Sequence, residues 1–164
     1  MLTNINTYEK FSSNVFVSRE TYEKLCVFEK ILIKWQNSIN LISRSTINSI
    51  WDRHFLDSAQ LYKFVTNVEG NIIDFGSGAG FPGMVLAIMG KKNIHLVESD
   101  QKKCVFLREI AMLTNLDITI HNCRIENLTN IDVDMITCRA LAPLNKLIDY
   151  VEVFLSKSSK EKEN

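Results

Sequence analysis

The stretch Ile72-Ile73-Asp74-Phe75-Gly76-Ser77-Gly78-Ala79-Gly80-Phe81-Pro82-Gly83 decides the fold of this chain. A short apolar run ends in an acidic residue, and four glycines follow within eight positions. Glycine permits positive φ and lets a ligand lie against the backbone. Glycines between an apolar strand and an apolar helix are typical of a loop that holds a nucleotide-like cofactor on backbone N–H groups. The stretch therefore predicts a cofactor site where a strand passes into a helix.

The segments that follow alternate between strand and helix patterns. This alternation indicates βαβ units around a parallel sheet, which is the Rossmann-like α/β class. The expected strands are 71–75, 93–98, 118–121 and 134–138, and the expected helices are 82–89, 101–113 and 143–154.

The chain before the glycine loop has helical periodicity instead. Ser18 is a predicted N-cap, and Val17 and Tyr22 occupy the positions of a hydrophobic staple. Helices are expected at about 7–13, from Ser18 to about residue 37, and from 46 to 64. The predicted organisation is a helical cap at 1–66, a cofactor-binding Rossmann-like domain at 67–156 and a polar tail at 157–164 that frays.

The composition argues against a strongly basic nucleic-acid-binding protein, a membrane protein and a secreted disulfide-rich protein. The 164 residues contain 19 Lys plus Arg and 19 Asp plus Glu, so the bulk charge shows no strong electrostatic grip on nucleic acid. No apolar run reaches the roughly 18 residues of a membrane span, and the N-terminus lacks a secretory pattern. The four cysteines have no C-x-x-C spacing and the three histidines are far apart in sequence. These features predict a cytoplasmic protein with reduced thiols, no metal site and no membrane contact.

Two cofactor templates fit the glycines. The stretch from Gly78 to Gly83 satisfies G-x-G-x-x-G, the dinucleotide fingerprint, with Glu98 at the expected distance. The stretch from Asp74 to Gly80 reads D-x-G-x-G-x-G, the pattern of S-adenosylmethionine-dependent methyltransferases. In both, a carboxylate at the end of the second strand accepts hydrogen bonds from the ribose hydroxyls.

Three details favour S-adenosylmethionine over a nicotinamide dinucleotide. Asp74 ends the first strand, where it can face the cationic methionine end of the cofactor but would repel a pyrophosphate. Phe81 and Pro82 fill space where a pyrophosphate needs bare backbone. The helical segment also precedes the sheet, whereas a dinucleotide-binding unit usually begins near its first strand.

The motifs along the chain resemble one family closely. From about Tyr22 to Leu155, the chain is similar to the bacterial 16S ribosomal RNA guanine-N7 methyltransferases, the glucose-inhibited division protein B or ribosomal RNA small subunit methyltransferase G family. The F-P-G end of the glycine loop and the R-H-x-L-D-S box are the specific features. The matching motifs are Asn40-Leu41-Ile42-Ser43, Arg53-His54-Phe55-Leu56-Asp57-Ser58, Asp74 to Gly83, Glu98-Ser99 with Lys102-Lys103 and Phe106-Leu107, Arg124-Ile125-Glu126 and Arg139-Ala140.

The resemblance implies methyl transfer from S-adenosylmethionine to N7 of a guanine in 16S rRNA or the small ribosomal subunit. Carried over by motif, Gly76 and Phe81 contact the cofactor, Ile125 and Glu126 lie beside its adenine, and Arg139 borders the pocket. The general glycine-loop pattern adds Asp74, Gly78 and Glu98. No catalytic acid or base is expected, because N7 has a free lone pair and no proton to lose.

The side chains near the expected pocket also have structural interpretations. His54 and Asp57 are expected to form a buried hydrogen-bonded pair. Arg139 suits a phosphate or guanine edge, and a salt bridge to Asp74 or Glu126 is an equally good interpretation.

The resemblance also implies more sheet than this sequence encodes. Family members continue past the last helix into three further strands, so the chain is expected to be a truncated member with an exposed fourth strand. Two alternatives stay open on the sequence, a non-catalytic remnant and an NAD(P)-dependent oxidoreductase.

Overall fold

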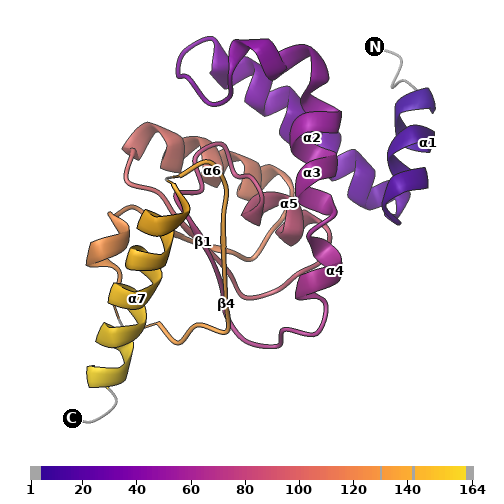
Figure 1. Ribbon diagram of the computed structural model, residues 1–164. Coiled ribbons are helices and arrows are strands. Elements are labelled where there is room, and N and C mark those ends of the chain that lie inside the picture. The colour runs from indigo at the N-terminus through magenta and orange to yellow at the C-terminus, as the bar shows by residue number, and fades with distance from the viewer. Residues whose placement is uncertain (1–4, 130, 142, 162–164) are drawn as a thin grey trace.

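The computed structural model describes residues 5–129, 131–141 and 143–161 (Figure 1). The helical elements before the sheet are α1 (Ile5–Asn14), α2 (Arg19–Gln36), the 3₁₀ helix η1 (Arg44–Ser49), the π-helix η2 (Trp51–Leu56), α3 (Asp57–Ala59) and α4 (Tyr62–Val65). They are followed by β1 (Ile72–Phe75), α5 (Gly83–Ile88), β2 (Ile94–Val97), α6 (Gln101–Leu113), β3 (Thr119–His121), the 3₁₀ helix η3 (Ile125–Asn127), β4 (Met135–Cys138) and α7 (Leu144–Glu161).

The sheet confirms the predicted α/β class. Four parallel strands lie in the order β3-β2-β1-β4. Ile72 of β1 is paired with Ile94 of β2 on one side and with Met135 of β4 on the other. The chain thus builds the sheet in one direction from β1 through β3 and then returns to the other side of β1. Ligands of such sheets bind at this reversal, beyond the carboxyl ends of the strands.

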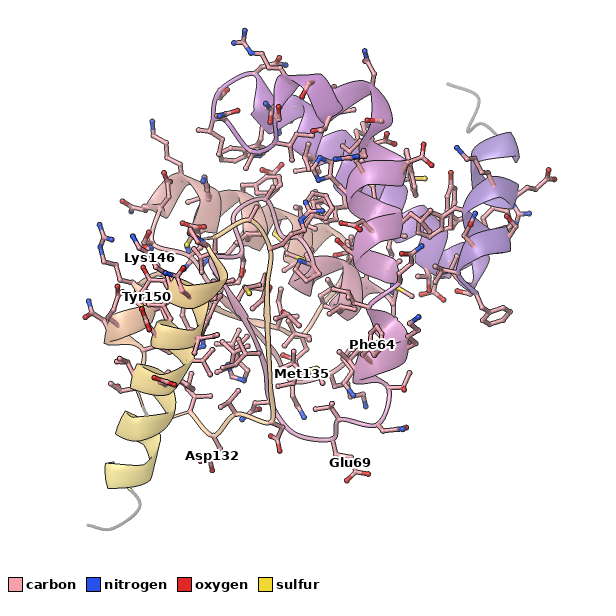
Figure 2. The ribbon with its side chains drawn as sticks, viewed as in Figure 1. Phe64, Glu69, Asp132, Met135, Lys146 and Tyr150 are labelled. Atoms are coloured by element: carbon pink, nitrogen blue, oxygen red, sulfur yellow. The ribbon has the colours of Figure 1, made fainter. Side chains whose placement is uncertain are left out.

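Strand residues alternate between two separate hydrophobic clusters, one on each face of the sheet. The cap-face cluster contains Ile72, Ile94 and Leu96, together with buried residues of α2, α5 and α6. The α7-face cluster is smaller and consists of the buried residues Ile73, Phe75, Val97, Ile125, Leu128 and Phe154. Figure 1 shows α7 on the opposite side of the sheet from α1 to α4, and Figure 2 shows Tyr150 on α7 and Met135 on β4.

The helical segment and the sheet share the cap-face cluster. Phe28 of α2 is fully buried and its ring stacks on Phe81 of the glycine loop, with centroids 5.0 Å apart. Phe55 meets both rings edge-on. The glycine loop therefore packs on aromatic side chains of the helical segment. The predicted boundary between a cap at 1–66 and a Rossmann-like domain at 67–156 stays a prediction.

The N-cap prediction for α2 is confirmed, because the Ser18 hydroxyl accepts a hydrogen bond from the Thr21 N–H at 3.1 Å. The segment predicted to be helical over 46–64 is helical, but it consists of a 3₁₀ helix, a π-helix and two short α-helices instead of one regular α-helix. Ile50 and Phe55 are both buried although they are five residues apart, and i to i+5 hydrogen bonding brings such residues onto one face. The π-helix η2 therefore replaces regular α-helix here.

The last helix is longer than predicted. It was expected to end at Phe154 and to be followed by a polar tail, but α7 continues to Glu161. No Gly or Pro occurs between Phe154 and Glu161, so extending an existing helix costs little. The rest of the expected tail, 162–164, lies outside the described residues. Within the described part of the chain, no helix combines the length and apolarity that a membrane crossing requires.

Candidate functional site

A cavity of about 560 Å³ lies at the carboxyl ends of the strands. This volume is in the range of small-molecule and cofactor pockets. Its walls come from the glycine loop, the residues after β2, β3 and β4, and the helical segment. The cavity brings together seven of the eight predicted cofactor residues, which are Gly76, Gly78, Phe81, Glu98, Ile125, Glu126 and Arg139.

The glycine loop turns sharply below this cavity. Gly76 has φ +63° and Gly78 has φ +52°, in the left-handed region that side chains disfavour. A Cβ on Gly76 would also lie 2.4 Å from Cδ1 of Leu141, so a side chain there would need both strain and rearrangement. A Cβ on Gly78 would meet only the carbonyl oxygen of Gly76, at 3.7 Å.

Glu98 is held in place by two backbone N–H groups. Its Oε2 accepts from the Gly78 N–H at 2.9 Å, and its Oε1 accepts from the Asp100 N–H at 2.8 Å. The residue is only 8% exposed but lines the cavity. Each carboxylate oxygen can accept a further hydrogen bond, so Glu98 can bind a pair of hydroxyls without losing its own support.

Asp74 does not line the cavity, contrary to the expectation that it faces a cofactor. It is completely buried beneath the loop, where Oδ1 accepts from the Thr137 hydroxyl at 2.8 Å and Oδ2 accepts from the Gly83 N–H at 3.3 Å. Burial raises the pKa of this carboxyl to about 6. By strand alternation Asp74 lies on the same face of β1 as Ile72, and its two hydrogen bonds link β4 to the first residue of α5.

Arg139 follows β4 and has partners other than those considered from sequence. Its Nη1 lies 3.4 Å from Oδ2 of Asp57 and donates to the Arg53 carbonyl at 3.2 Å. Its guanidinium carbon lies 4.9 Å from the centroid of the Phe81 ring. The ion-pair partner of Arg139 is therefore Asp57, and not Asp74 or Glu126 as in one of the two interpretations from sequence. The predicted hydrogen bond between His54 and Asp57 is also wrong, since both side chains contact Arg139.

The helical segment supplies a wall of the cavity that the predicted site residues do not include. Residues 41–43, Thr46 and His54 line this side. Gln36 fixes the preceding loop, because its Oε1 accepts from the N–H groups of Leu41 and Ile42 at 3.0 Å each. Most of these residues belong to the N-L-I-S and R-H-x-L-D-S motifs, so the motifs could have predicted that the helical segment lines the cavity.

The other additions to the wall come from the sheet side. Lys103, Arg124 and Tyr150 also line the cavity, and they bring two basic side chains and a phenol to its rim. Arg124 belongs to the Arg124-Ile125-Glu126 motif, whereas Tyr150 lies on α7 and belongs to none of the motifs.

Two histidines that are far apart in sequence meet outside this cavity. His95 Nδ1 lies 3.0 Å from His121 Nε2, on neighbouring strands. Among the described residues, no group of three or more His, Cys, Asp or Glu side chains could hold a metal ion.

Comparison with known proteins identifies a family. The family model described as "GidB: rRNA small subunit methyltransferase G" matches residues 21–160. Proteins named ribosomal RNA small subunit methyltransferase G are similar to this chain in several bacteria. That of Paramagnetospirillum magneticum is 47% identical over 82% of this chain and 65% of its own length. That of Granulibacter bethesdensis is 49% identical over 87% and 67%, and that of Rhodospirillum rubrum is 47% identical over 91% and 74%.

The matches therefore span about two thirds to three quarters of the relatives' length. Among solved structures, a Pyrococcus abyssi tRNA (uracil-54, C5)-methyltransferase in complex with S-adenosyl-L-homocysteine aligns with 49% of this chain and 21% of its own, at 20% identity and a TM-score of 0.41. That likeness is too low to bear on function, whereas the family match covers most of the chain. The chain belongs to the rRNA small subunit methyltransferase G family.

Proposed function

We propose that this chain binds S-adenosylmethionine in the cavity beyond β1, β2 and β4 and transfers its methyl group to N7 of a guanine in 16S rRNA. The observation that carries the proposal is the convergence of seven predicted cofactor residues on one cavity at the reversal point of the sheet. The names of the relatives support small-subunit rRNA as the substrate.

The residues of the cavity suit this cofactor. Glu98 offers carboxylate oxygens to ribose hydroxyls, and the open face of Gly78 lets a ligand approach the backbone. Ile125 and Glu126 lie on the cavity wall, where an apolar side chain and backbone groups can hold an adenine. Arg139 provides a cation that suits the carboxylate of the methionine part.

Bound S-adenosylmethionine supplies an electrophilic methyl group. Glu98, Ile125 and Arg139 would hold the cofactor so that its methyl carbon could bond to guanine N7 as the bond from sulfur breaks. N7 uses its own lone pair and loses no proton, so the chain needs no general base. Its residues contribute by holding the reacting atoms in line and by excluding water.

The partner and location follow from the substrate. We propose that 16S rRNA, or the small ribosomal subunit that contains it, is bound beside the rim residues Lys103 and Arg124, and that the reaction takes place in the cytoplasm. In this proposal the cap at 1–66 forms one wall of the site and the Rossmann-like part at 67–156 forms the rest.

Labelled methyl transfer tests the proposal. The chain is incubated with S-adenosylmethionine carrying a radioactive methyl group and with small subunits from a strain that lacks the N7 modification. We expect label in 16S rRNA at one guanine, and no label in subunits that are already modified. Cofactor binding without methyl transfer would instead support the non-catalytic alternative.

Calorimetry tests the cofactor separately. We expect S-adenosylmethionine and S-adenosylhomocysteine to bind and a nicotinamide dinucleotide not to bind. Binding of the dinucleotide alone would overturn the assignment in favour of the oxidoreductase alternative.

A further inference from the structure

His54 is a histidine on the cavity wall for which methyl transfer to N7 provides no chemical role. It belongs to η2, and its ring lies 5.1 Å from that of Phe81 at an interplanar angle of 31°. Both of its ring nitrogens have partners. Nδ1 lies 2.5 Å from Nη2 of Arg139, and Nε2 lies 2.8 Å from Oγ1 of Thr46.

We propose that His54 is a positioning residue for Arg139, fixing its guanidinium against the Phe81 ring where it borders the cofactor cavity and tying it to the helical segment through Thr46. The contact itself is a property of this chain, whereas its consequence for the cofactor rests on the proposed function. His54 acts through Arg139 and does not touch the reacting atoms in this scheme.

The hydrogen-bond directions in this chain of contacts follow from chemistry. A guanidinium has only donors, so His54 Nδ1 must accept from Arg139. The neutral ring then carries its proton on Nε2 and donates to the Thr46 hydroxyl oxygen. Thr46 in turn donates its own proton to the Ser43 carbonyl at 2.8 Å. Only the neutral Nε2–H tautomer satisfies every contact, because a doubly protonated ring would direct a donor at Arg139.

The charges around His54 keep it in that state. Burial, followed by the positive charge of Arg139, lowers its pKa to about 4. That value already includes the opposing effect of the Asp57 carboxylate and a smaller lowering effect of Arg53. The imidazole is therefore neutral across the range in which a methyl-transfer assay is performed.

The contacts of Arg139 fall on different parts of its guanidinium group. The Phe81 ring lies under its guanidinium, and Asp57 and the Arg53 carbonyl hold Nη1. His54 holds Nη2. Phe81 itself is 4% exposed and packed by Phe28 and Phe55. Removing the His54 acceptor would release one side of the guanidinium fork while leaving the aromatic support intact.

Two amide variants separate the two halves of this role. In His54→Asn, the amide oxygen can take the place of Nδ1 and accept from Arg139, but the side chain cannot reach Thr46. In His54→Gln, the amide nitrogen can take the place of Nε2 and donate to Thr46, but the Nδ1 acceptor is gone. A role through Arg139 predicts that Asn is the better replacement, and a merely structural role in the helical segment predicts that Gln is.

The first measurement is S-adenosylhomocysteine affinity by calorimetry. We expect His54→Gln to weaken binding roughly tenfold or more, as for loss of a hydrogen bond to a charged group, and His54→Asn to weaken it only about threefold. In an Arg139→Ala background, the His54→Gln effect should disappear. The reverse order of the two variants, or a His54→Gln effect that persists without Arg139, would overturn the proposal. Lys24→Ala on α2, outside the cavity lining, serves as the control for unchanged affinity.

The second measurement needs no cofactor. The pKa of His54 is followed by NMR of its ring protons, in the original chain and in Arg139→Ala. We expect a pKa near 4 that rises towards the ordinary value of 6.5 when the arginine is removed. An unchanged pKa would refute the contact. If the original chain binds no cofactor, the proposed function fails, and this titration alone decides whether His54 and Arg139 are coupled.

Discussion

The two faces of the sheet differ in how they are covered. On the cap face, α2, α5 and α6 bury a continuous cluster in which Phe28 contacts the rings of Phe55, Phe81 and Phe106. On the α7 face, one helix and the short η3 cover a much smaller cluster, and Ile148 and Val153 of α7 remain 49% and 46% exposed.

The two sides of the cavity are therefore supported by different amounts of packing. The glycine loop is supported from the cap face by stacked aromatic rings, whereas Leu141 and Tyr150 reach the cavity from the more thinly packed side. Parallel strands are usually covered on both faces. We therefore expect the cap face to carry most of the stability and the α7 face to carry more of the mobility.

Removing one phenylalanine from each face compares the two most directly. Phe28→Ala should lower the free energy of unfolding by about 3–5 kcal/mol, because a large side chain is lost from a site with packed rings around it. Phe154→Ala should cost less, about 2–3 kcal/mol, because among the described residues its ring contact is with Phe75 and the cluster around it is small enough to collapse in part. Urea unfolding measures both, and equal losses would contradict the proposed difference between the faces.

Asp74 gives the cap face a dependence on pH. Burial raises its pKa from 3.8 to about 6. Because the folded-state pKa lies above the unfolded one, its stabilising contribution is complete below about pH 3.8 and is lost as pH rises through about 6. Relative to Asp74→Asn, the original chain should lose about 1–2 kcal/mol of unfolding free energy between pH 5 and pH 7.5.

The Asn replacement is a fair reference because its amide can accept from Gly83 and donate to Thr137. Urea unfolding at the two pH values provides the comparison. If the difference between the two proteins does not change with pH, the carboxyl titrates normally and the raised pKa is wrong.

Gly76 lies where the two faces meet, because its missing Cβ leaves room for Leu141 of the α7 side. Gly76→Ala should cost about 1–2 kcal/mol through its positive φ, and it should also abolish binding of S-adenosylhomocysteine. Gly90→Ala is the matched control. Gly90 also has positive φ, but its Cβ would meet only the Tyr62 hydroxyl at 3.9 Å, outside the cavity.

Thermal melting and calorimetry on the two variants distinguish the effect of backbone strain on stability from the effect of the added side chain on cofactor binding. Both should melt earlier, and only Gly76→Ala should lose the cofactor. Retained binding in Gly76→Ala would contradict this prediction. It would mean that the Leu141 side chain can be displaced without loss of the cofactor site.

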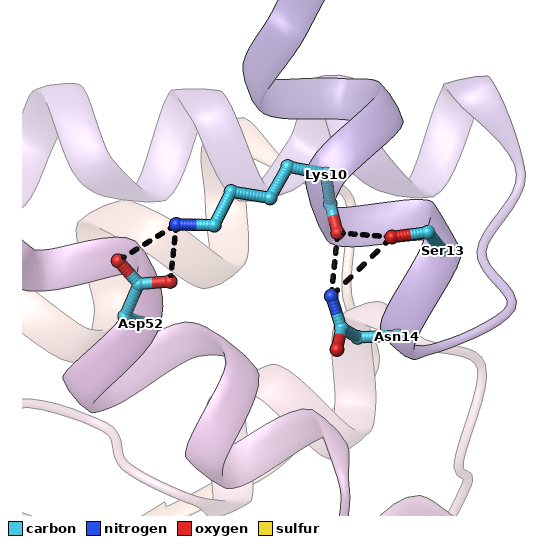
Figure 3. A network of polar contacts seen from close by, with 4 residues as sticks. All are labelled: Lys10, Ser13, Asn14 and Asp52. Atoms are coloured by element: carbon cyan, nitrogen blue, oxygen red, sulfur yellow. Dashed lines mark hydrogen bonds and ion pairs between the residues drawn. The ribbon is translucent and has the colours of Figure 1, made fainter.

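The edge of the cap face should contribute least. Lys10 of α1 lies 3.0 Å from Oδ1 of Asp52 in η2 (Figure 3), with side chains 67% and 52% exposed. Such exposed ion pairs contribute about 0–1 kcal/mol and are screened by salt. Lys10→Ala should change the unfolding free energy within that range in urea titrations. A larger loss, independent of salt, would mean that the Lys10–Asp52 contact contributes more than an exposed ion pair should.

The local elements were largely readable from sequence. The α/β class, the four strands and the Ser18 cap follow from apolar periodicity and from backbone preferences that act over a few residues. Seven of the eight predicted cofactor residues also line one cavity, because parallel strands bring their carboxyl ends to a single edge.

Several of the predictions that were wrong depend on contacts that only the packed structure creates. The partner of Arg139 is Asp57, which is 82 residues away in the chain. Asp74 was expected at the cavity, but the turn of the loop places it below. The π-helix η2 arises because Ile50 and Phe55 must both be buried against the same core.

The sequence by itself therefore determined the kind of site, a glycine loop followed by an acid at the end of the next strand. The tertiary structure decided which side chains face the cavity and which support it. The physical reason is that glycines and strand patterns constrain the local backbone, whereas burial and hydrogen-bond partners depend on how the helical segment packs over the loop. Asp74 and His54 illustrate this, since both became supporting residues only when Thr137, Gly83, Arg139 and Thr46 came within hydrogen-bonding distance of them.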